Sequence, residues 1–460
     1  MRSLKSLGRH PLINGLAVLA VTQFGASLVG LLRENVLARI FQNNLGVVDA
    51  YIAAFNPSDL LFQTCVVSAM GTVLVPVLAQ YKARGNDREV AKVLSGTIGM
   101  TALLFGCVAL LLAIFFPLLI PLFNIHFQGE TLRLYIQFGR LALLSNFLFV
   151  FGNAYGQYLV TVERYWIYGV TPILYTLGTV FGALWLTPIV GPFGPMYGTV
   201  LGAVIYVILR MFAVRLHGCR LGISLWHPDL PEMGRLMLPR VLSLGAFQIQ
   251  LLYLNGFASA LGKGSVTINA FARNFQSVLV GVVGISVAQA VYSRLSQAAA
   301  KGDGERMRMY FRSGVWLALI LTVLGAIAMV ILAPFEARLV HLSAYLKIFT
   351  ISLSIYAISI PFESISHIQY RAFYALKETI LPAFMGVLGG AVAILVGWFF
   401  LGVYGIYALA LGYTAGEIVQ TVFLGMVLPS RMRKRLRSIP VSYDIAKAEV
   451  ELEEAEKNVL

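Results

Sequence analysis

Charged side chains inside long apolar stretches are the residues of this chain best suited to chemistry. Arg33 and Glu34 lie near the end of the first stretch, Asp49 opens the second, and Arg273 lies about two turns inside a later one. Ionisable residues are costly in hydrocarbon, so they usually face a cavity or a partner. An arginine in a cavity can bind a phosphate bidentately. We predict that these four residues bind an anionic substrate and that Asp49 positions Arg33; interfacial ion pairs are the alternative.

A second group of charges lies in the later part of the chain. Glu363 and His367 are four residues apart, so a helix would place them on one face. A carboxylate beside an imidazole can hold a proton or a small cation, and Glu417 adds another acid within an apolar stretch. We predict that these three residues couple the protein to an ion; a structural pair between packed helices is the alternative.

Motifs of the common enzyme classes are missing from the sequence. It contains no P-loop, no nucleophile elbow, no His-Glu-x-x-His and no acidic metal cluster. The cysteines, Cys65, Cys107 and Cys219, are scattered and suggest neither a disulfide framework nor a metal site. We therefore predict no catalytic residue, no metal and no cofactor. Transport would then draw on the membrane potential, a Na⁺ or H⁺ gradient, or the lipid gradient itself.

Composition identifies the class of protein. Of the 460 residues, 58% are hydrophobic and 12% are charged, whereas soluble domains have about 45–50% and roughly 25%. Apolar runs of about 18 residues or more can cross a bilayer as helices. The sequence predicts an all-α polytopic membrane protein with twelve transmembrane helices. They lie near residues 12–38, 48–80, 92–123, 133–161, 165–187, 192–215, 235–262, 266–296, 310–334, 342–373, 378–401 and 403–429.

The basic residues orient these spans. The net charge is +14, and most lysines and arginines, Arg210 among them, fall in segments that this layout puts on one side of the membrane. Positive charge concentrates on the cytosolic side, so both termini are predicted to be cytosolic. The basic residues follow short loops and form no RNA-binding or zinc signature, so nucleic acid is not an expected partner.

The two halves of the chain resemble each other. Residues 48–56 resemble residues 268–276, an offset of 220, and residues 80–86 resemble residues 297–303, an offset of 217. Residues 158–163 likewise resemble residues 373–378. Six spans per repeat give a parallel repeat, and such transporters bind substrate between their halves. We predict a lobe over 1–215, a cytosolic linker over 216–234, a second lobe over 235–430 and a basic, then acidic, tail over 431–460.

The first hairpin resembles a known family. Residues 30–41, 49–55 and 75–81 are similar to the opening of the MurJ (MviN) lipid II flippases. This family belongs to the MOP superfamily, together with the MATE drug exporters and the Wzx-type polysaccharide flippases. Residues 264–266, 281–284 and 374–379 look like further family segments, and the likeness covers roughly residues 10–430.

This resemblance implies a fold and a site. It implies two six-helix lobes in a V shape around a cationic cavity, which binds the pyrophosphate of an undecaprenyl-linked precursor. The family's arginine and the acid after it carry over onto Arg33 and Glu34, and its aspartate opening span two carries over onto Asp49.

The sequence also departs from the family pattern. Ser27, Phe62 and Gln63 stand where the family has arginines, and the span-eight Asp-Arg pair of the family aligns with Arg273-Asn274. The family's last two helices, which form its lipid groove, have no counterpart in this sequence. The resemblance therefore implies that fewer residues would bind the pyrophosphate in this chain than in the family.

We expect a flippase and not an enzyme. The expected substrate is a polyprenyl-pyrophosphate-linked saccharide, with the peptidoglycan precursor lipid II first, moved across the bacterial cytoplasmic membrane by alternating access. The protein would be a monomer whose partners are this lipid-linked saccharide and the membrane lipids. The alternatives are a Wzx-like polysaccharide repeat-unit flippase, a cation-coupled MATE-like drug exporter that depends on Glu363 and Glu417, and a membrane scaffold without a central cavity.

Overall fold

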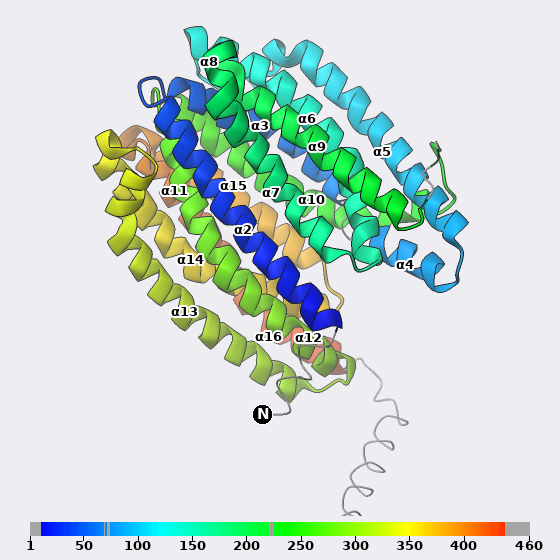
Figure 1. Cartoon of the computed structure of the whole chain (residues 1–460). Helices are drawn as coiled ribbons and strands as arrows, with labels where there is room; N and C mark the ends of the chain where they lie inside the picture. The colour runs from blue at the N-terminus through cyan, green and yellow to red at the C-terminus, as the bar shows by residue number, and fades with distance from the viewer. Residues whose placement is uncertain (1–10, 69, 71–73, 220–221, 223, 438–460) are drawn as a thin grey trace, which may run out of the picture.

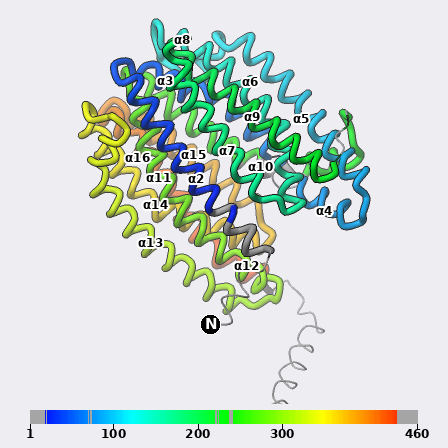
Figure 2. The backbone as a smooth tube through the Cα atoms, in the orientation of Figure 1, coloured from blue at the N-terminus to red at the C-terminus, as the bar shows by residue number. Residues whose placement is uncertain are grey.

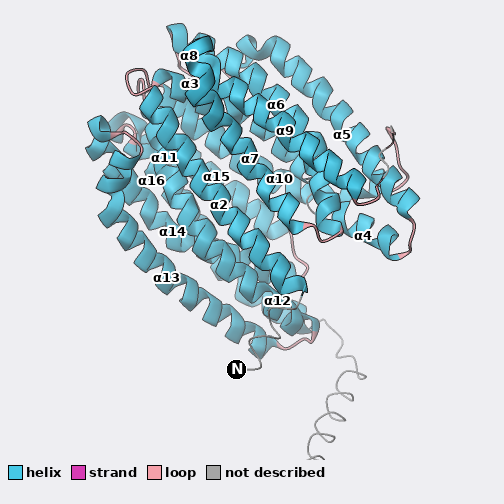
Figure 3. Ribbon diagram, in the orientation of Figure 1, coloured by secondary structure: helices cyan, strands magenta, loops and turns pink. Residues whose placement is uncertain are grey.

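The structure is a computed structural model that describes residues 11–68, 70, 74–219, 222 and 224–437, and all regular elements in these ranges are helical (Figures 1 and 3). Predictions for the N-terminal ten residues, for the acidic part of the tail after residue 437 and for part of the linker fall outside the described residues. The predicted all-α class is confirmed.

The first lobe consists of the helices before the linker. α2 packs against α7, α3 against α6, and α9 against both α6 and α7. In chain order the elements are α2 (Pro11–Ile40), α3 (Gly46–Phe62), the π-helical turn η1 (Gln63–Val67), α4 (Val75–Ala83), α5 (Asp87–Phe115), η3 (Phe116–Leu119), α6 (Gly129–Thr161), α7 (Tyr165–Phe181), the π-helical turn η4 (Gly182–Leu186), α8 (Thr187–Val190), η5 (Gly191–Phe193) and α9 (Gly194–Leu216).

The second lobe follows the linker, and Figure 2 traces the chain from one lobe into the other. α10 packs against α15, while α14 packs against α11, α12, α13 and α16. The elements are α10 (Leu230–Ser259), α11 (Ser265–Leu279), the π-helical turn η6 (Val280–Ile285), α12 (Ser286–Ala300), α13 (Gly304–Leu339), η7 (Ser343–Tyr345), α14 (Leu346–Ala375), α15 (Ile380–Tyr404) and α16 (Tyr407–Arg437).

The helices form twelve long rods in the described part of the chain, as predicted. Three rods are composite: α3 continues into η1, α7 through η4 into α8, and α11 through η6 into α12. Among the described residues, eight stretches are long and apolar enough to cross a membrane, and one of these covers both α7 and α9. The chain is therefore a multi-pass membrane protein.

Backbone geometry repeats between the lobes, which confirms the internal repeat. The π-helical turns η1 and η6 start 217 residues apart, at Gln63 and Val280. Asn86 and Asp303, also 217 apart, cap α5 and α13 by accepting hydrogen bonds from Glu89 and Arg306 backbone amides. Residues with positive φ recur in pairs: Gly85 and Gly302, Asn124 and His341, Glu163 and Lys377, and Gly191 and Gly405. The pair Glu163 and Lys377 shifts our alignment of residues 158–163 by one position. Sequence similarity had matched Val162 to Lys377.

Glycines allow the closest helix contacts in each lobe. In the first lobe, a Cβ atom at Gly182 would lie 2.3 Å from the Gly194 carbonyl oxygen. In the second lobe, a Cβ atom at Gly416 would lie 2.5 Å from the Gly389 carbonyl oxygen. Small residues spaced along a helix let backbones approach closely in membranes, where packing replaces the hydrophobic effect as the driving force. The pairs α7–α9 and α15–α16 therefore form equivalent rigid units.

Arg210 lies inside the first lobe, so our assignment of it to the cytosolic segments is wrong. It is 2% exposed. Its guanidinium donates to the carbonyls of Gly152 (2.9 Å) and Tyr168 (2.7 Å) and to the hydroxyl of Thr171 (2.7 Å), and it stacks 4.1 Å from the centre of the Tyr206 ring. Arg210, on α9, is therefore bonded to both α6 and α7, and the helix carbonyls stabilise its charge.

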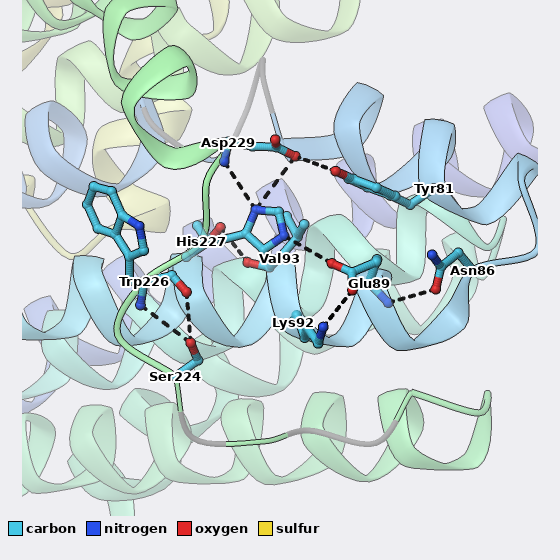
Figure 4. A network of polar contacts seen from close by, with 10 residues as sticks. Tyr81, Asn86, Glu89, Lys92, Val93, Ser224, Trp226, His227 and Asp229 are labelled. Carbon is cyan, nitrogen blue, oxygen red and sulfur yellow. Dashed lines mark hydrogen bonds and ion pairs between the residues drawn. The ribbon is translucent and has the colours of Figure 1, made fainter.

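The described part of the linker docks on the first lobe where α4 and α5 meet (Figure 4). His227 is buried, and its Nε2 atom lies 3.3 Å from Oε2 of Glu89. The Asp229 amide donates to Nδ1 of His227 (3.2 Å), and the Tyr81 hydroxyl donates to the Asp229 carboxylate (2.9 Å). That last bond raises the pKa of the Tyr81 phenol above its ordinary value, which keeps the donor protonated.

The backbone of the linker crosses α5 at two glycines. A Cβ atom at Gly99 would lie only 2.0 Å from the Ser224 carbonyl oxygen, and one at Gly96 would lie 3.2 Å from the Trp226 backbone. Larger residues would push the linker away from α5. These contacts fix the start of α10 relative to the first lobe, because α10 begins at Leu230, directly after the docked residues.

Candidate functional site

A cavity of about 430 Å³ lies between the two lobes. α2, α3, α6 and α7 supply its wall from the first lobe, and α10 and α11 supply it from the second. α2 runs beside α7 and also contacts α11, so it lines the junction (Figure 1). The polar lining residues are Arg33, Glu34, Asn56, Asp59, Gln63, Asn146, Gln248, Asn255, Arg273 and Asn274, and the aromatic ones are Tyr51, Phe55, Phe62, Phe149, Tyr175 and Phe271.

Arg33 and Glu34 line this cavity from α2, near its C-terminal end. The Arg33 guanidinium lies 3.5 Å from the Glu34 carboxylate, and the two side chains are 29% and 3% exposed. The Asn274 amide, on α11 of the other lobe, donates to Glu34. Nε of Arg33 is buried without a hydrogen-bond partner. A buried donor without a partner is costly, and the exposed part of the Arg33 side chain faces the cavity.

Arg273 lines the cavity from the second lobe, one residue before Asn274 on α11. Each lobe therefore contributes one arginine to the same space. In the described part of the chain, no ion pair forms at Arg273. The sequence-predicted pair Arg33 and Arg273 is thus brought together around one cavity, although the two residues are 240 positions apart.

Asp49 does not position Arg33, and that prediction is wrong. Its carboxylate accepts hydrogen bonds from the backbone amides of Gly264 (2.5 Å) and Thr267 (2.8 Å) and from the Thr267 hydroxyl (2.6 Å). The residue is 0% exposed and borders a separate small cavity with His126 and Lys263. Asp49 therefore caps the N-terminus of α11 across the lobe boundary, where backbone amides favour a carboxylate.

The formal charges lining the cavity balance, which differs from the cationic cavity that the resemblance implied. Arg33 and Arg273 face Glu34 and Asp59. The acids are already engaged within the protein: Asn146 donates to Asp59 (2.9 Å), and Glu34 is paired as described above. Nε of Arg33 and Oε2 of Glu34 each lack a partner, so the arginines are the cationic groups to which an anionic ligand would bind.

Most of the polar lining was missed by the sequence reasoning. Asn56, Asp59 and Gln63 lie on one face of the rod formed by α3 and η1, at spacings of three and four residues. This polar stripe in an apolar span was a readable signal. By contrast, Asn146 on α6 and Asn255 on α10 are isolated in sequence, and only packing brings them to the cavity.

A chain of side-chain hydrogen bonds crosses the lobe boundary at the cavity-lining residues Asn56 and Asn255. The Tyr356 hydroxyl donates to Asn269 (2.7 Å), Asn269 donates to Asn255 (3.3 Å), and Asn255 donates to Asn56 of the first lobe (3.3 Å). The His126 amide also donates to Ser259 of α10 (2.8 Å) across this boundary. The two bonds that cross the boundary, Asn255 to Asn56 and His126 to Ser259, must break for the lobes to separate at this end.

The predicted ion-coupling residues lie inside the second lobe and not in the central cavity. Glu363 on α14 accepts hydrogen bonds from Gln276 of α11 (2.7 Å) and Tyr413 of α16 (3.0 Å). Glu417 follows Tyr413 by one helical turn, is 8% exposed, and its Oε2 atom has no hydrogen-bond partner. His367 packs its ring edge against Tyr370 instead of meeting the Glu363 carboxylate.

Comparison with known proteins identifies the family. The family profile described as "Lipid II flippase MurJ" matches residues 17–448. This chain belongs to the MurJ lipid II flippase family. A probable lipid II flippase MurJ of Bdellovibrio bacteriovorus is 22% identical over 436 residues, covering 90% of this chain and 82% of that protein. A probable MurJ of Thermotoga maritima is 23% identical, covering 91% and 86%.

Solved structures of the MurJ family and its relatives share the fold. A lipid II flippase MurJ in an inward closed conformation superposes with a TM-score of 0.78 at 19% identity, covering 91% of this chain and 90% of that one. An inward-facing MATE multidrug transporter of the MOP superfamily also reaches a TM-score of 0.78, at 15% identity, covering 90% and 96%. The predicted two-lobe MOP architecture is confirmed, and the family is one of transporters.

Proposed function

We propose that this chain translocates a polyprenyl-pyrophosphate-linked saccharide, with lipid II as the substrate, across the bacterial cytoplasmic membrane. The observation that carries this proposal is the cavity between the lobes, to which each lobe contributes one arginine. Guanidinium groups bind phosphate oxygens bidentately. A diphosphate held between Arg33 and Arg273 would bridge the two lobes, so its binding would respond to their relative position.

The rest of the cavity suits a sugar. Side-chain amides both donate and accept hydrogen bonds, as sugar hydroxyl and acetamido groups require, and the Phe149 and Tyr175 rings offer apolar faces. A volume of about 430 Å³ is within the range of small-molecule sites. In this conformation the cavity would admit the diphosphate and the sugar next to it, while a longer headgroup would extend out of it.

Alternating access would use the lobe boundary as a gate. The hydrogen bonds of Asp49 with Gly264 and Thr267, and of His126 with Ser259, join the lobes at one end. Following the distribution of basic residues, we assign this joined end to the outer side of the membrane, with both termini cytosolic. Substrate would then bind from the cytosolic leaflet and leave after these bonds break.

The test replaces the two cavity arginines. Arg33→Gln and Arg273→Gln should each reduce flipping of lipid II in reconstituted vesicles by roughly tenfold or more, because a hydrogen bond to a charged group contributes about 1.5–3 kcal/mol. Arg39→Gln is the matched control, since Arg39 is an exposed arginine of α2 outside the cavity lining. Undiminished flipping in both cavity variants would refute the proposal.

Ion coupling through the second lobe is a further part of this proposal. Glu363 and Glu417 form a buried pair of acids in which one carboxylate oxygen lacks a partner, and such a site favours a proton or a small cation. Glu417→Gln should remove the dependence of flipping on a Na⁺ or H⁺ gradient while leaving substrate binding intact. Flipping that keeps its full gradient dependence in this variant would exclude the coupling role.

The same experiments separate the alternatives. A drug exporter would need Glu363 and Glu417, and it would show no flipping of lipid II even as the unmodified chain. A flippase of another saccharide lipid would still need Arg33 and Arg273, since the diphosphate is shared, but would prefer a different headgroup in competition assays. The arginine pair favours a diphosphate lipid over a drug, and family membership favours lipid II over another saccharide lipid.

A further inference from the structure

The membrane-facing side of α13 carries two cations outside the central cavity. Arg308 and Arg312 are exposed and, with Met309, Ser313 and Trp316, line an open hollow near the Gly304 end of the helix. The neighbouring Arg306 pairs with Asp303 at 3.2 Å, whereas within the described ranges neither Arg308 nor Arg312 has an ion-pair partner. No acidic residue lines the hollow.

An apolar groove lies farther along the same helix. It has a volume of about 420 Å³ between α13 and α14, and its lining includes Val323, Ile327 and Val330 from α13 and Ile358 and Phe362 from α14. These side chains face away from the lobe core, since Val330 and Ile358 are 38% and 55% exposed. Figure 2 shows α13 at the outer edge of the second lobe, where surrounding lipid would touch it.

The hollow and the groove lie on one face of α13. At 100° per residue, Arg308, Arg312, Trp316, Val323 and Ile327 all fall within one third of the helix circumference. Tryptophan is enriched at the boundary between headgroups and hydrocarbon, so Trp316 marks that boundary. Ten residues beyond it, at about 15 Å, the groove reaches the depth at which one leaflet ends.

We propose that α13 binds an anionic phospholipid of the surrounding membrane. Its phosphodiester would be held by Arg308 and Arg312, the Ser313 hydroxyl would donate to a phosphate oxygen, and one acyl chain would run past Trp316 into the groove between α13 and α14. Basic pockets beside membrane helices on the cytosolic side bind anionic headgroups in this way. This site is separate from the central cavity and does not depend on the proposed function.

The test measures lipid retention by native mass spectrometry after partial delipidation in detergent. The full chain should retain phosphatidylglycerol in preference to phosphatidylcholine. The double variant Arg308→Gln/Arg312→Gln should retain at least about fivefold less phosphatidylglycerol, given roughly 1 kcal/mol per basic residue near the surface. Arg338→Gln, an exposed arginine at the other end of α13, is the matched control and should retain as much as the unmodified chain.

A second pair of variants tests the acyl chain. Val330→Trp should fill the groove and lower phosphatidylglycerol retention, whereas Leu324→Trp, at an exposed position outside the groove lining, should not. Inorganic phosphate at the same concentration should not displace the lipid. Equal retention in the double variant and the Arg338 control, equal retention of phosphatidylcholine, no effect of Val330→Trp, or displacement by free phosphate would each overturn the proposal.

Discussion

Arg33 and Arg210 are both arginines within membrane helices, but their surroundings differ in kind. Arg210 is 2% exposed and donates to three acceptors on α6 and α7. Arg33 is partly exposed to the cavity, and its Nε atom has no partner. A satisfied cation stabilises the fold, while an unsatisfied one at a cavity is available for a ligand. The hydrogen bonds of each arginine thus distinguish a structural role from a ligand-binding role, which the residue type alone does not.

We predict that Arg210→Met destabilises the first lobe strongly. The change removes three hydrogen bonds from a charged donor, to the Gly152 and Tyr168 carbonyls and the Thr171 hydroxyl, and bonds of this kind contribute about 1.5–3 kcal/mol each. The melting temperature of the purified protein in detergent should fall by several degrees, and Arg210→Lys should restore only part of it because lysine lacks the planar fork. Arg215→Met, at an exposed position of the same helix, should melt like the unmodified chain; equal melting of the Arg210 variant would contradict this account.

The composite rods are the elements that build the cavity. α3 with η1 and α11 with η6 each contain a π-helical turn at equivalent positions of the repeat. Such turns break the regular register of a helix and are frequent at functional sites. Here η1 begins at the cavity-lining residue Gln63, and η6 begins six residues after the cavity-lining residue Asn274. The helices and their π-helical turns therefore repeat between the lobes, although the side chains that line the cavity do not.

A second prediction concerns the docking of the linker on α5. Gly99→Ala places a methyl group 2.0 Å from the Ser224 carbonyl oxygen, so the linker must move. Alanine normally stabilises a helix by about 1 kcal/mol over glycine, but here the clash should cost about 1–3 kcal/mol. We expect a lower melting temperature and faster limited proteolysis within residues 216–234.

The control for this prediction is Gly234→Ala. A Cβ atom at Gly234, in α10, would meet no atom within 4 Å, so the substitution should be neutral or stabilising. If Gly99→Ala behaved like this control, the linker would not be held against α5 in solution.

At the scale of the whole molecule, the two lobes meet through polar contacts at one end. Asp49 caps α11, Asn255 bonds to Asn56, and the His126 amide donates to Ser259. These polar bonds accompany apolar contacts, since one buried apolar cluster contains residues of both lobes. Polar bonds can be exchanged for bonds to water, and movement of two lobes about their interface is a common class of conformational change, so we expect the lobes to move relative to each other at this end.

We predict that a covalent link at this end stops transport. In a chain with its three native cysteines replaced, His126→Cys and Ser259→Cys should form a cross-link that abolishes lipid II flipping, and a reductant should restore it. Thr179→Cys and Thr199→Cys are the control, since their hydroxyl oxygens lie 2.8 Å apart within the first lobe. Full activity of the oxidised inter-lobe pair would show that this end does not open during transport.

The local sequence was sufficient for the class, the twelve rods and the repeat. Apolar runs longer than a bilayer, punctuated by caps such as Asn86 and Asp303, specify helices and their ends without long-range information. The polar stripe of Asn56, Asp59 and Gln63 was also readable, because helical spacing fixes which side chains share a face.

Tertiary structure decided what each charge does. Arg33, Asp49, Arg210 and Arg273 are alike in sequence, since each is an ionisable residue in or beside an apolar run. Packing directed Asp49 to the first turn of α11, buried Arg210 among helix carbonyls, and left Arg33 and Arg273 on the wall of one cavity. The sequence alone determined that Arg33, Asp49 and Arg273 lie in or beside membrane spans. Their partners come from residues up to 218 positions away, so only the folded arrangement of the helices determines which charges are satisfied.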